Sequence, residues 1–278
     1  MLDPADVLVL PHDVRHLPGR LVDDVRRVAH PLNSTAGEVL ACPGESLGCA
    51  AERIARRWGL APEQARADVL RFAWHLNAAA LANVQRGTGR GSRTLAWIVL
   101  TLRLLPAGRL PQASVRRIAL DTRSPSRAIG SAVISLGPRA VRAATVAAAV
   151  LALAGAAAGS VSPWAVVALA GSLGASLVVH ETAHVVALAG EPAALVLAGP
   201  RTSLLHGDLG DRRRAVVAAV GPLATGAVGV VATAGALELS SALAALVACP
   251  PAGHALAATV ASIDGRTACG LTATERRR

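Results

Sequence analysis

The chain has 278 residues, a mean hydropathy of +0.46 and a formal net charge of +10. Its length allows about two compact units, and its hydropathy is high for a soluble protein. The positive charge gathers just before the first long apolar segment, so we expect membrane lipid as a partner and no nucleic acid.

The distribution of charge divides the chain. Residues 1–90 hold 11 Arg and 10 acidic residues, whereas residues 91–142 hold nine Arg and one acidic residue, Asp121. Arg-rich stretches are retained on the cytoplasmic side of a membrane, so we expect a multi-pass protein of the cell membrane with both termini in the cytoplasm. No signal peptide is expected at the N-terminus. We interpret the four cysteines, which form no C-x-x-C pair, as free thiols of a reducing compartment: Cys42, Cys49, Cys249 and Cys269.

The first 85 residues predict a small winged-helix-like α+β domain. Residues 6–10 have strand character, and three helices follow. The first is expected to open with a capping box at Thr35 and Glu38, the second to run from a Ser46 cap to Gly59, and the third to start at Pro62. In the third helix the apolar residues repeat at three and four positions: Val69, Phe72, Ala73 and Leu76.

Three segments of this domain resemble the PqqD-like family: Leu32-Asn-Ser-Thr-Ala36, Ala51-Glu-Arg-Ile-Ala55 and Ala67-Asp-Val-Leu-Arg-Phe72. The family recognises leader peptides of ribosomally made, post-translationally modified precursors. The resemblance implies that a leader adds as a strand beside the small sheet and contacts pockets near Val69, Phe72 and Leu76. One departure is Ala80, where the family often has glycine. The alternative interpretation is a helical cap on a membrane protein.

The rest of the chain predicts a polytopic, mainly α-helical membrane protein. A basic linker is expected over residues 86–140, in which residues 95–105 are too short to span and are expected to lie on the membrane surface. The membrane domain is expected over residues 141–270 and a cytoplasmic tail over residues 271–278. About four spans are predicted within the membrane domain, at residues 143–159, 164–190, 215–237 and 242–263.

The second predicted span contains His180-Glu181-Thr-Ala-His184, an H-E-x-x-H motif. Residues four apart share a face of a helix, so both imidazoles can bind one ion while Glu181 lies beside them. Two neutral imidazoles suit tetrahedral zinc, and one Zn²⁺ per chain is expected. Glu181 would serve as the general base for an attacking water.

A third zinc ligand is expected from a distant segment. Asp264 lies at a compatible depth near the cytoplasmic end of the fourth predicted span, and His254 is the main competitor as a ligand or transition-state donor. The stretches Ala219-Val-Gly-Pro-Leu-Ala224 and Ile263-Asp-Gly-Arg266 also resemble motifs of site-2-protease-type enzymes, whose Asp is the third ligand. The resemblance covers residues 164–270. It departs at Leu256 and Thr259, where the family commonly has Asn-x-x-Pro.

Together these features predict an intramembrane zinc metalloendopeptidase that binds and cleaves the leader of a modified peptide precursor. One alternative is a regulatory protease that cleaves a membrane-embedded partner. Another is a membrane scaffold or immunity protein that binds leaders on an inactive protease fold. Intact metal-binding motifs argue against the scaffold, because polar groups in a membrane span are costly.

Overall fold

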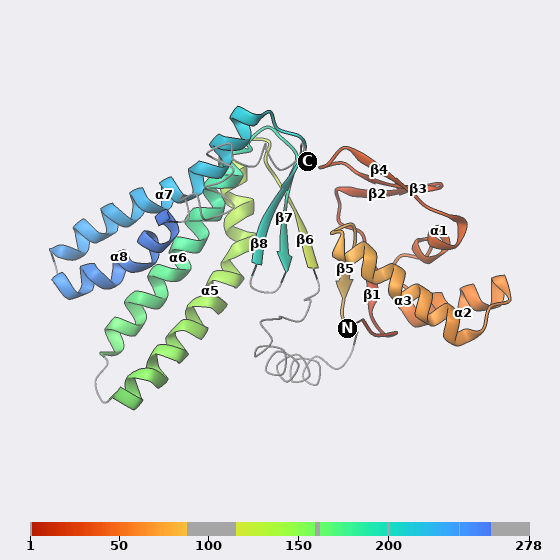
Figure 1. Ribbon diagram of the computed structural model, residues 1–278, viewed down its shortest axis with the longest axis horizontal. Helices are drawn as coiled ribbons and strands as arrows, with labels where there is room; N and C mark the ends of the chain where they lie inside the picture. The colour runs from red at the N-terminus through yellow and green to blue at the C-terminus, as the bar shows by residue number, and fades with distance from the viewer. Residues whose placement is uncertain (1, 88–114, 159–161, 199–200, 239, 257–278) are drawn as a thin grey trace, which may run out of the picture. The chain divides into compact units, whose positions relative to one another are not determined.

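The computed structural model describes residues 2–87, 115–158, 162–198, 201–238 and 240–256. The chain divides into two compact units (Figure 1). The first, here called the N-terminal unit, consists of residues 1–119 and 194–207, and the second, here called the helical unit, consists of residues 120–193 and 208–278. Residues 194–207, which lie in the sequence between two long apolar helices, therefore belong to the same unit as the N-terminus.

The N-terminal unit contains three groups of short strands. Strands β1 (Val7–Val9) and β5 (Asn83–Gln85) pair antiparallel, with Leu8 opposite Val84. A meander of β2 (Val14–Leu17), β3 (Arg20–Asp23) and β4 (Val28–Pro31) leaves β2 and β4 as edge strands. The third sheet has the order β6 (Val115–Leu120), β7 (Ala193–Ala198) and β8 (Arg201–His206).

Three helices follow the meander: α1 (Ser34–Leu40), α2 (Leu47–Trp58) and α3 (Pro62–Ala78). The predicted start and end of α2 are confirmed, because Ser46 accepts a hydrogen bond from the amide of Cys49 and Gly59 takes the left-handed conformation at φ 64°. The predicted capping box of α1 is wrong. The helix begins earlier, and Asn33 caps it by accepting a bond from the amide of Ala36, which suits an Asn side chain.

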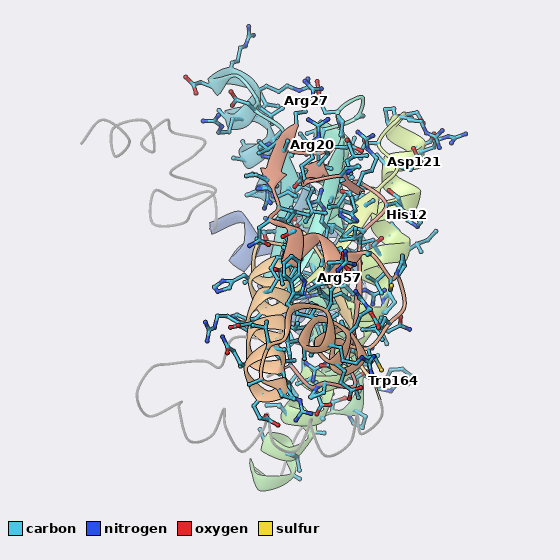
Figure 2. All side chains as sticks on the ribbon, turned by 90° about the vertical axis from the view of Figure 1, so that its right-hand side faces the viewer. His12, Arg20, Arg27, Arg57, Asp121 and Trp164 are labelled. Atoms are coloured by element: carbon cyan, nitrogen blue, oxygen red, sulfur yellow. The ribbon has the colours of Figure 1, made fainter. Side chains whose placement is uncertain are left out.

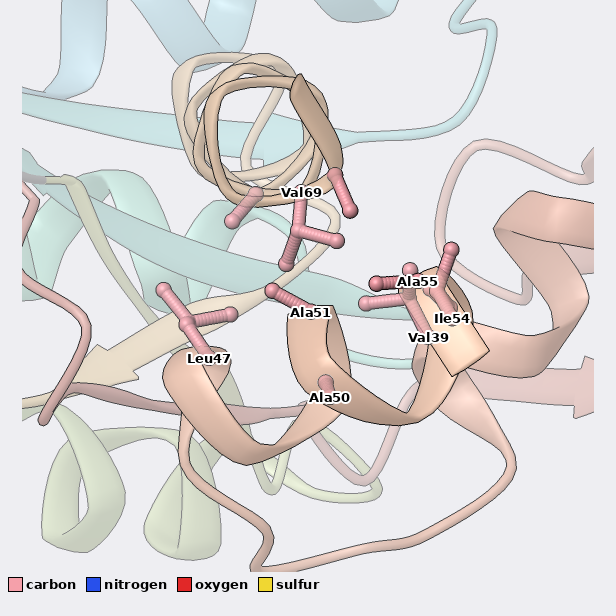
Figure 3. Packing of buried hydrophobic residues seen from close by; sticks show 9 residues of the cluster. Val39, Leu47, Ala50, Ala51, Ile54, Ala55 and Val69 are labelled. Carbon is pink, nitrogen blue, oxygen red and sulfur yellow. The ribbon is translucent and has the colours of Figure 1, made fainter. Parts of the chain in front are cut away.

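The apolar faces of the three helices form two clusters of buried side chains. Figure 3 shows the larger one, in which residues of α2 pack against α3 and α1. Val69 of α3 is 3% exposed in this cluster, and Leu76 is 6% exposed in the second. Three Arg residues of this unit that are exposed on the surface are labelled in Figure 2: Arg20, Arg27 and Arg57.

Strand β6 is held to the rest of the N-terminal unit by polar side chains. The side-chain amide of Asn77 donates to the carbonyl of Val115 and accepts from its backbone N–H. The side-chain amide of Asn83 bonds in the same two ways to the backbone of Arg117. The Arg117 side chain is fully buried and its guanidinium contacts Asp13 at 2.6 Å and Asp23 at 2.8 Å. The expected linker over residues 86–140 thus contains an integral strand of this unit.

The helical unit contains α5 (Pro125–Ala158), α6 (Pro163–Ala187), α7 (Asp211–Leu237) and α8 (Ser241–Leu256). Helix α5 begins well before the predicted residue 143. Pro125, which lies in the expected linker, occupies the first turn of the helix, where its missing N–H is harmless. The connection between the second and third predicted spans contains β7 and β8. The segment 95–105 lies outside the described residues.

Three helices are long and apolar enough to cross a membrane within the part of the chain that the structure describes: Pro125–Ala156, Pro163–Ala187 and Asp211–Leu237. The protein is therefore consistent with a helical membrane protein. Trp164, labelled in Figure 2, is 79% exposed at the first turn of α6, a position that suits an interfacial aromatic residue. The fourth predicted span is described only as far as Leu256, within α8.

Candidate metal centre

Helix α6 carries both imidazoles of the H-E-x-x-H motif on one buried face. His180 and His184 are each 7% exposed, and they are four residues apart, about one helical turn. Their Nε2 atoms lie 3.1 Å apart. The helix continues without a break through the motif, from Pro163 to Ala187. Local helical periodicity alone therefore brings the two predicted ligands together.

The spacing of the two Nε2 atoms fits a single zinc ion. Zinc binds imidazole nitrogen at about 2.0–2.1 Å in tetrahedral geometry, which sets two nitrogens on one ion roughly 3.3 Å apart. The observed 3.1 Å is close to that value. The two side chains need no large rearrangement to share an ion.

Helix α7 orients the second imidazole. The Nδ1 atom of His184 lies 2.5 Å from the backbone oxygen of Val217, so that Nδ1–H donates to the carbonyl and Nε2 keeps its lone pair. Gly221 lies against the same ring, where a Cβ atom would overlap the imidazole. The glycine of the Gly-Pro-Leu-Ala stretch is thus required by the close approach of α7 to His184.

Glu181, the predicted general base, is partly buried beside the imidazoles on α6. Arg139 of α5 lies close enough for the two charges to interact. An opposite charge offsets part of the cost of burying a carboxylate in apolar surroundings. Arg139 was not singled out from the sequence, because it was placed in the linker; an Arg inside an apolar helix is the signal that could have found it.

Neither candidate for a third ligand has a described side chain. Within the described residues, no three His, Cys, Asp or Glu side chains form a metal-binding group. Asp264 lies outside the described residues. The backbone of His254 belongs to α8, but its side chain is not described.

The helix register gives the depth of His254. Ser172 of α6 donates a 2.8 Å hydrogen bond to the carbonyl of Val247 on α8, which sets these two residues level. Helices α6 and α8 run in the same direction, since α7 separates them in the chain and runs the opposite way (Figure 1). His180 is eight residues after Ser172 and His254 is seven after Val247, so their backbones lie at similar depth.

The predicted peptide contacts lie on α3, apart from the metal motif in sequence. Val69 and Leu76 are core side chains with 3% and 6% exposure, so an incoming peptide has little access to them. Phe72 is only partly buried and packs against both clusters. Of the three residues, Phe72 is the one that offers a surface to a peptide.

Cys42, Cys49 and Cys249 are exposed and form no disulfide, whereas the reducing compartment expected for them stays a prediction. Cys269 lies outside the described residues.

Comparison with known proteins finds no matching family model, no matching characterised protein and no matching solved structure. The function must therefore be argued from the site itself.

Proposed function

We propose that this chain is an intramembrane zinc metalloendopeptidase in which His180 and His184 bind the metal and Glu181 is the general base. The observation that carries the proposal is the pair of buried imidazoles with Nε2 atoms 3.1 Å apart on an apolar helix. Asp264 is the proposed third ligand from the resemblance to site-2-type proteases, and the depth of His254 makes it the alternative to test beside it. Both termini are proposed to face the cytoplasm.

A zinc ion at this position would polarise a peptide carbonyl and increase the acidity of water. The residues of the chain supply the remaining functions. Glu181 takes a proton from the water whose oxygen bonds to the carbonyl carbon, and delivers a proton to the amine nitrogen as the C–N bond breaks. Val217 fixes the orientation of His184, and Arg139 stabilises the charged form of Glu181.

The N-terminal unit is proposed to capture the leader of a modified peptide precursor. Strand β4 is an edge of the meander, and its Val28 is 44% exposed, so an extended peptide can add beside it. The same compact unit includes residues 194–207, and residue 194 follows His184 by only ten positions. Capture by this unit would raise the concentration of the peptide near the protease.

Metal analysis of the detergent-purified protein tests the proposal. We expect about one zinc per chain in the wild type and in Glu181→Gln, and loss of zinc in His180→Ala and His184→Ala. Asp264→Ala and His254→Ala, compared side by side, identify the third ligand. Cleavage of added apolar peptides, read by mass spectrometry, is expected in the wild type and absent in Glu181→Gln.

Two results would contradict the proposal. A wild-type protein without zinc after metal-replete purification would favour the scaffold instead. Full cleavage by Glu181→Gln would remove the carboxylate from the mechanism. Binding of a labelled leader is a separate question, and a leader that shows no saturable binding to the full chain would leave the protease but remove the capture function.

A further inference from the structure

A cavity of about 340 Å³ lies between α6, α7 and α8 of the helical unit, the helices that run side by side in Figure 1. Its α6 wall includes Gly171, Ser172, Ser176 and Val179. Val167 and Val228 also line it, and they are 61% and 51% exposed, so the cavity opens to the outside of the helix bundle.

The cavity continues the interface that holds the metal motif. On α6, Ser172 and Ser176 precede His180 and His184 at steps of four residues, so all four share one helix face. On α7, Thr225 lines the cavity one turn after Gly221, the residue that lies against His184. The inner end of the cavity is therefore about one turn, roughly 5 Å along the axis, from the two imidazoles.

The lining offers an occupant apolar surface. The Ser172 hydroxyl donates to Val247 O at 2.8 Å, and the Thr225 hydroxyl donates to Gly221 O at 2.9 Å, so both are engaged within the protein. Apart from Ser176, the remaining wall is made of Ala, Val, Gly and Pro residues. A cavity of roughly 150 Å³ with such a lining holds a benzene-sized guest. A leucine side chain therefore fits here.

We propose that this cavity is a specificity pocket that receives one large aliphatic side chain of the substrate, next to the bond that is cut. The inference rests on the proposed protease function and deepens it. An aliphatic side chain in the pocket places the adjoining peptide backbone beside His180. Gly171 sets the size of the pocket, because it lines the cavity and a Cβ atom there meets no heavy atom within 4 Å.

Zinc-binding hydroxamates test the pocket without a known substrate. Acetohydroxamate probes the metal alone, isocaproyl hydroxamate adds the branched carbon chain of leucine, and succinyl hydroxamate adds a charged group of similar length. Binding is measured by calorimetry on the full-length zinc-loaded protein in detergent. The variant is Gly171→Leu, and the matched control is Gly235→Leu in α7, where a Cβ atom also meets nothing within 4 Å and which does not line the cavity.

We expect isocaproyl hydroxamate to bind the wild type and Gly235→Leu about tenfold or more tightly than acetohydroxamate does, a difference of about 1.4 kcal/mol or more. Succinyl hydroxamate should show no such gain. Gly171→Leu should lose the gain while still binding acetohydroxamate. If that variant fails to hold zinc, Ala175→Leu, which fills the same cavity from an exposed position, must give the same loss.

The results that overturn the inference differ from those that overturn the proposed function. Acetohydroxamate binding with no gain for the isocaproyl group, or a gain that persists in Gly171→Leu and Ala175→Leu, would refute the pocket alone. A phospholipid that copurifies with the wild type, is lost in Gly171→Leu and accompanies the absence of a gain would assign the cavity to an acyl chain. A wild type with neither zinc nor acetohydroxamate binding would refute both the protease and its pocket.

Discussion

Replacing Gly221 with Ala tests the arrangement of the metal centre at a residue that binds no metal. A Cβ atom at this position would lie closest to Nε2 of His184, and it would also lie 2.7 Å from Cε1 and 2.8 Å from Cδ2 of that ring. Ordinary carbon contacts begin near 3.4 Å, so the ring must move by about 0.7 Å or more, or the helices must separate. The bond from Nδ1 to Val217 O restricts the direction in which the ring can move.

Because that displacement changes the spacing of the two Nε2 atoms, we expect Gly221→Ala to lower zinc affinity about 10- to 100-fold, as other changes that disturb the orientation of a ligand do. Zinc affinity is measured by competition with a fluorescent chelator on detergent-purified protein. Gly235→Ala is the control on the same helix, since a Cβ atom there meets nothing within 4 Å. Wild-type affinity in Gly221→Ala would refute the placement of His184 against α7, and equal losses in both variants would indicate a general sensitivity of the helix.

Three further predictions concern the N-terminal unit, and hydrogen exchange of peptides from residues 2–87 in the full chain measures each of them. Arg117→Met removes the shortest side-chain contact of the buried Asp23 carboxylate, which then keeps only the 3.4 Å contact with Arg26 and two backbone amides, and should destabilise the unit by about 3–5 kcal/mol. Unchanged protection would show that the ion pairs with Arg117 contribute nothing. Burial raises the pKa of Asp23, but its hydrogen bonds with Arg117 and the backbone of Arg26 outweigh burial and leave the pKa below its usual value. The stability that the Asp23 carboxylate supplies is therefore present above the unfolded pKa of about 3.9 and is lost as pH falls through the folded pKa. Protection that is independent of pH below 4 would contradict this prediction. Ala80 has φ 57°, in the left-handed region where a β-branched side chain is strained. Ala80→Gly should therefore change the stability of the unit by less than about 1 kcal/mol, whereas Ala80→Val should destabilise it by about 2 kcal/mol or more. Equal effects of the two substitutions would refute the backbone strain at this position.

The parts of the fold that could be predicted are those set by local chemistry. Ser46, Gly59 and Pro62 act through the backbone within one helical turn, and each lies where the sequence placed it. The same reasoning failed at Thr35 because a nearer candidate, Asn33, supplies a better cap. It failed again at Pro125, since proline ends one element and begins another with equal ease.

Contacts between distant segments left no such signal. Arg117 bonds to Asp13 across 104 residues and sits in a stretch whose many Arg residues suggested a basic linker. The Arg117 side chain can be fully buried because the carboxylates of Asp13, directly before β2, and Asp23, in β3, pair with it. Charge content alone cannot separate such a residue from the exposed Arg residues around it, because burial is set by tertiary packing.

The metal motif lies between these two cases. Helical periodicity was sufficient to place His180 and His184 on one face, but the reason why that face is buried comes from α7, through the Val217 carbonyl and the close approach of Gly221. Ser172 and Ser176 extend the same face by two turns, so the polar groups of this apolar helix gather where it meets other helices. A membrane helix confines polar side chains in this way because lipid offers them no hydrogen-bond partner. The stripe of polar residues therefore marks the inner face of α6, and the H-E-x-x-H motif, the cavity and the contacts with α7 and α8 all lie on that single face.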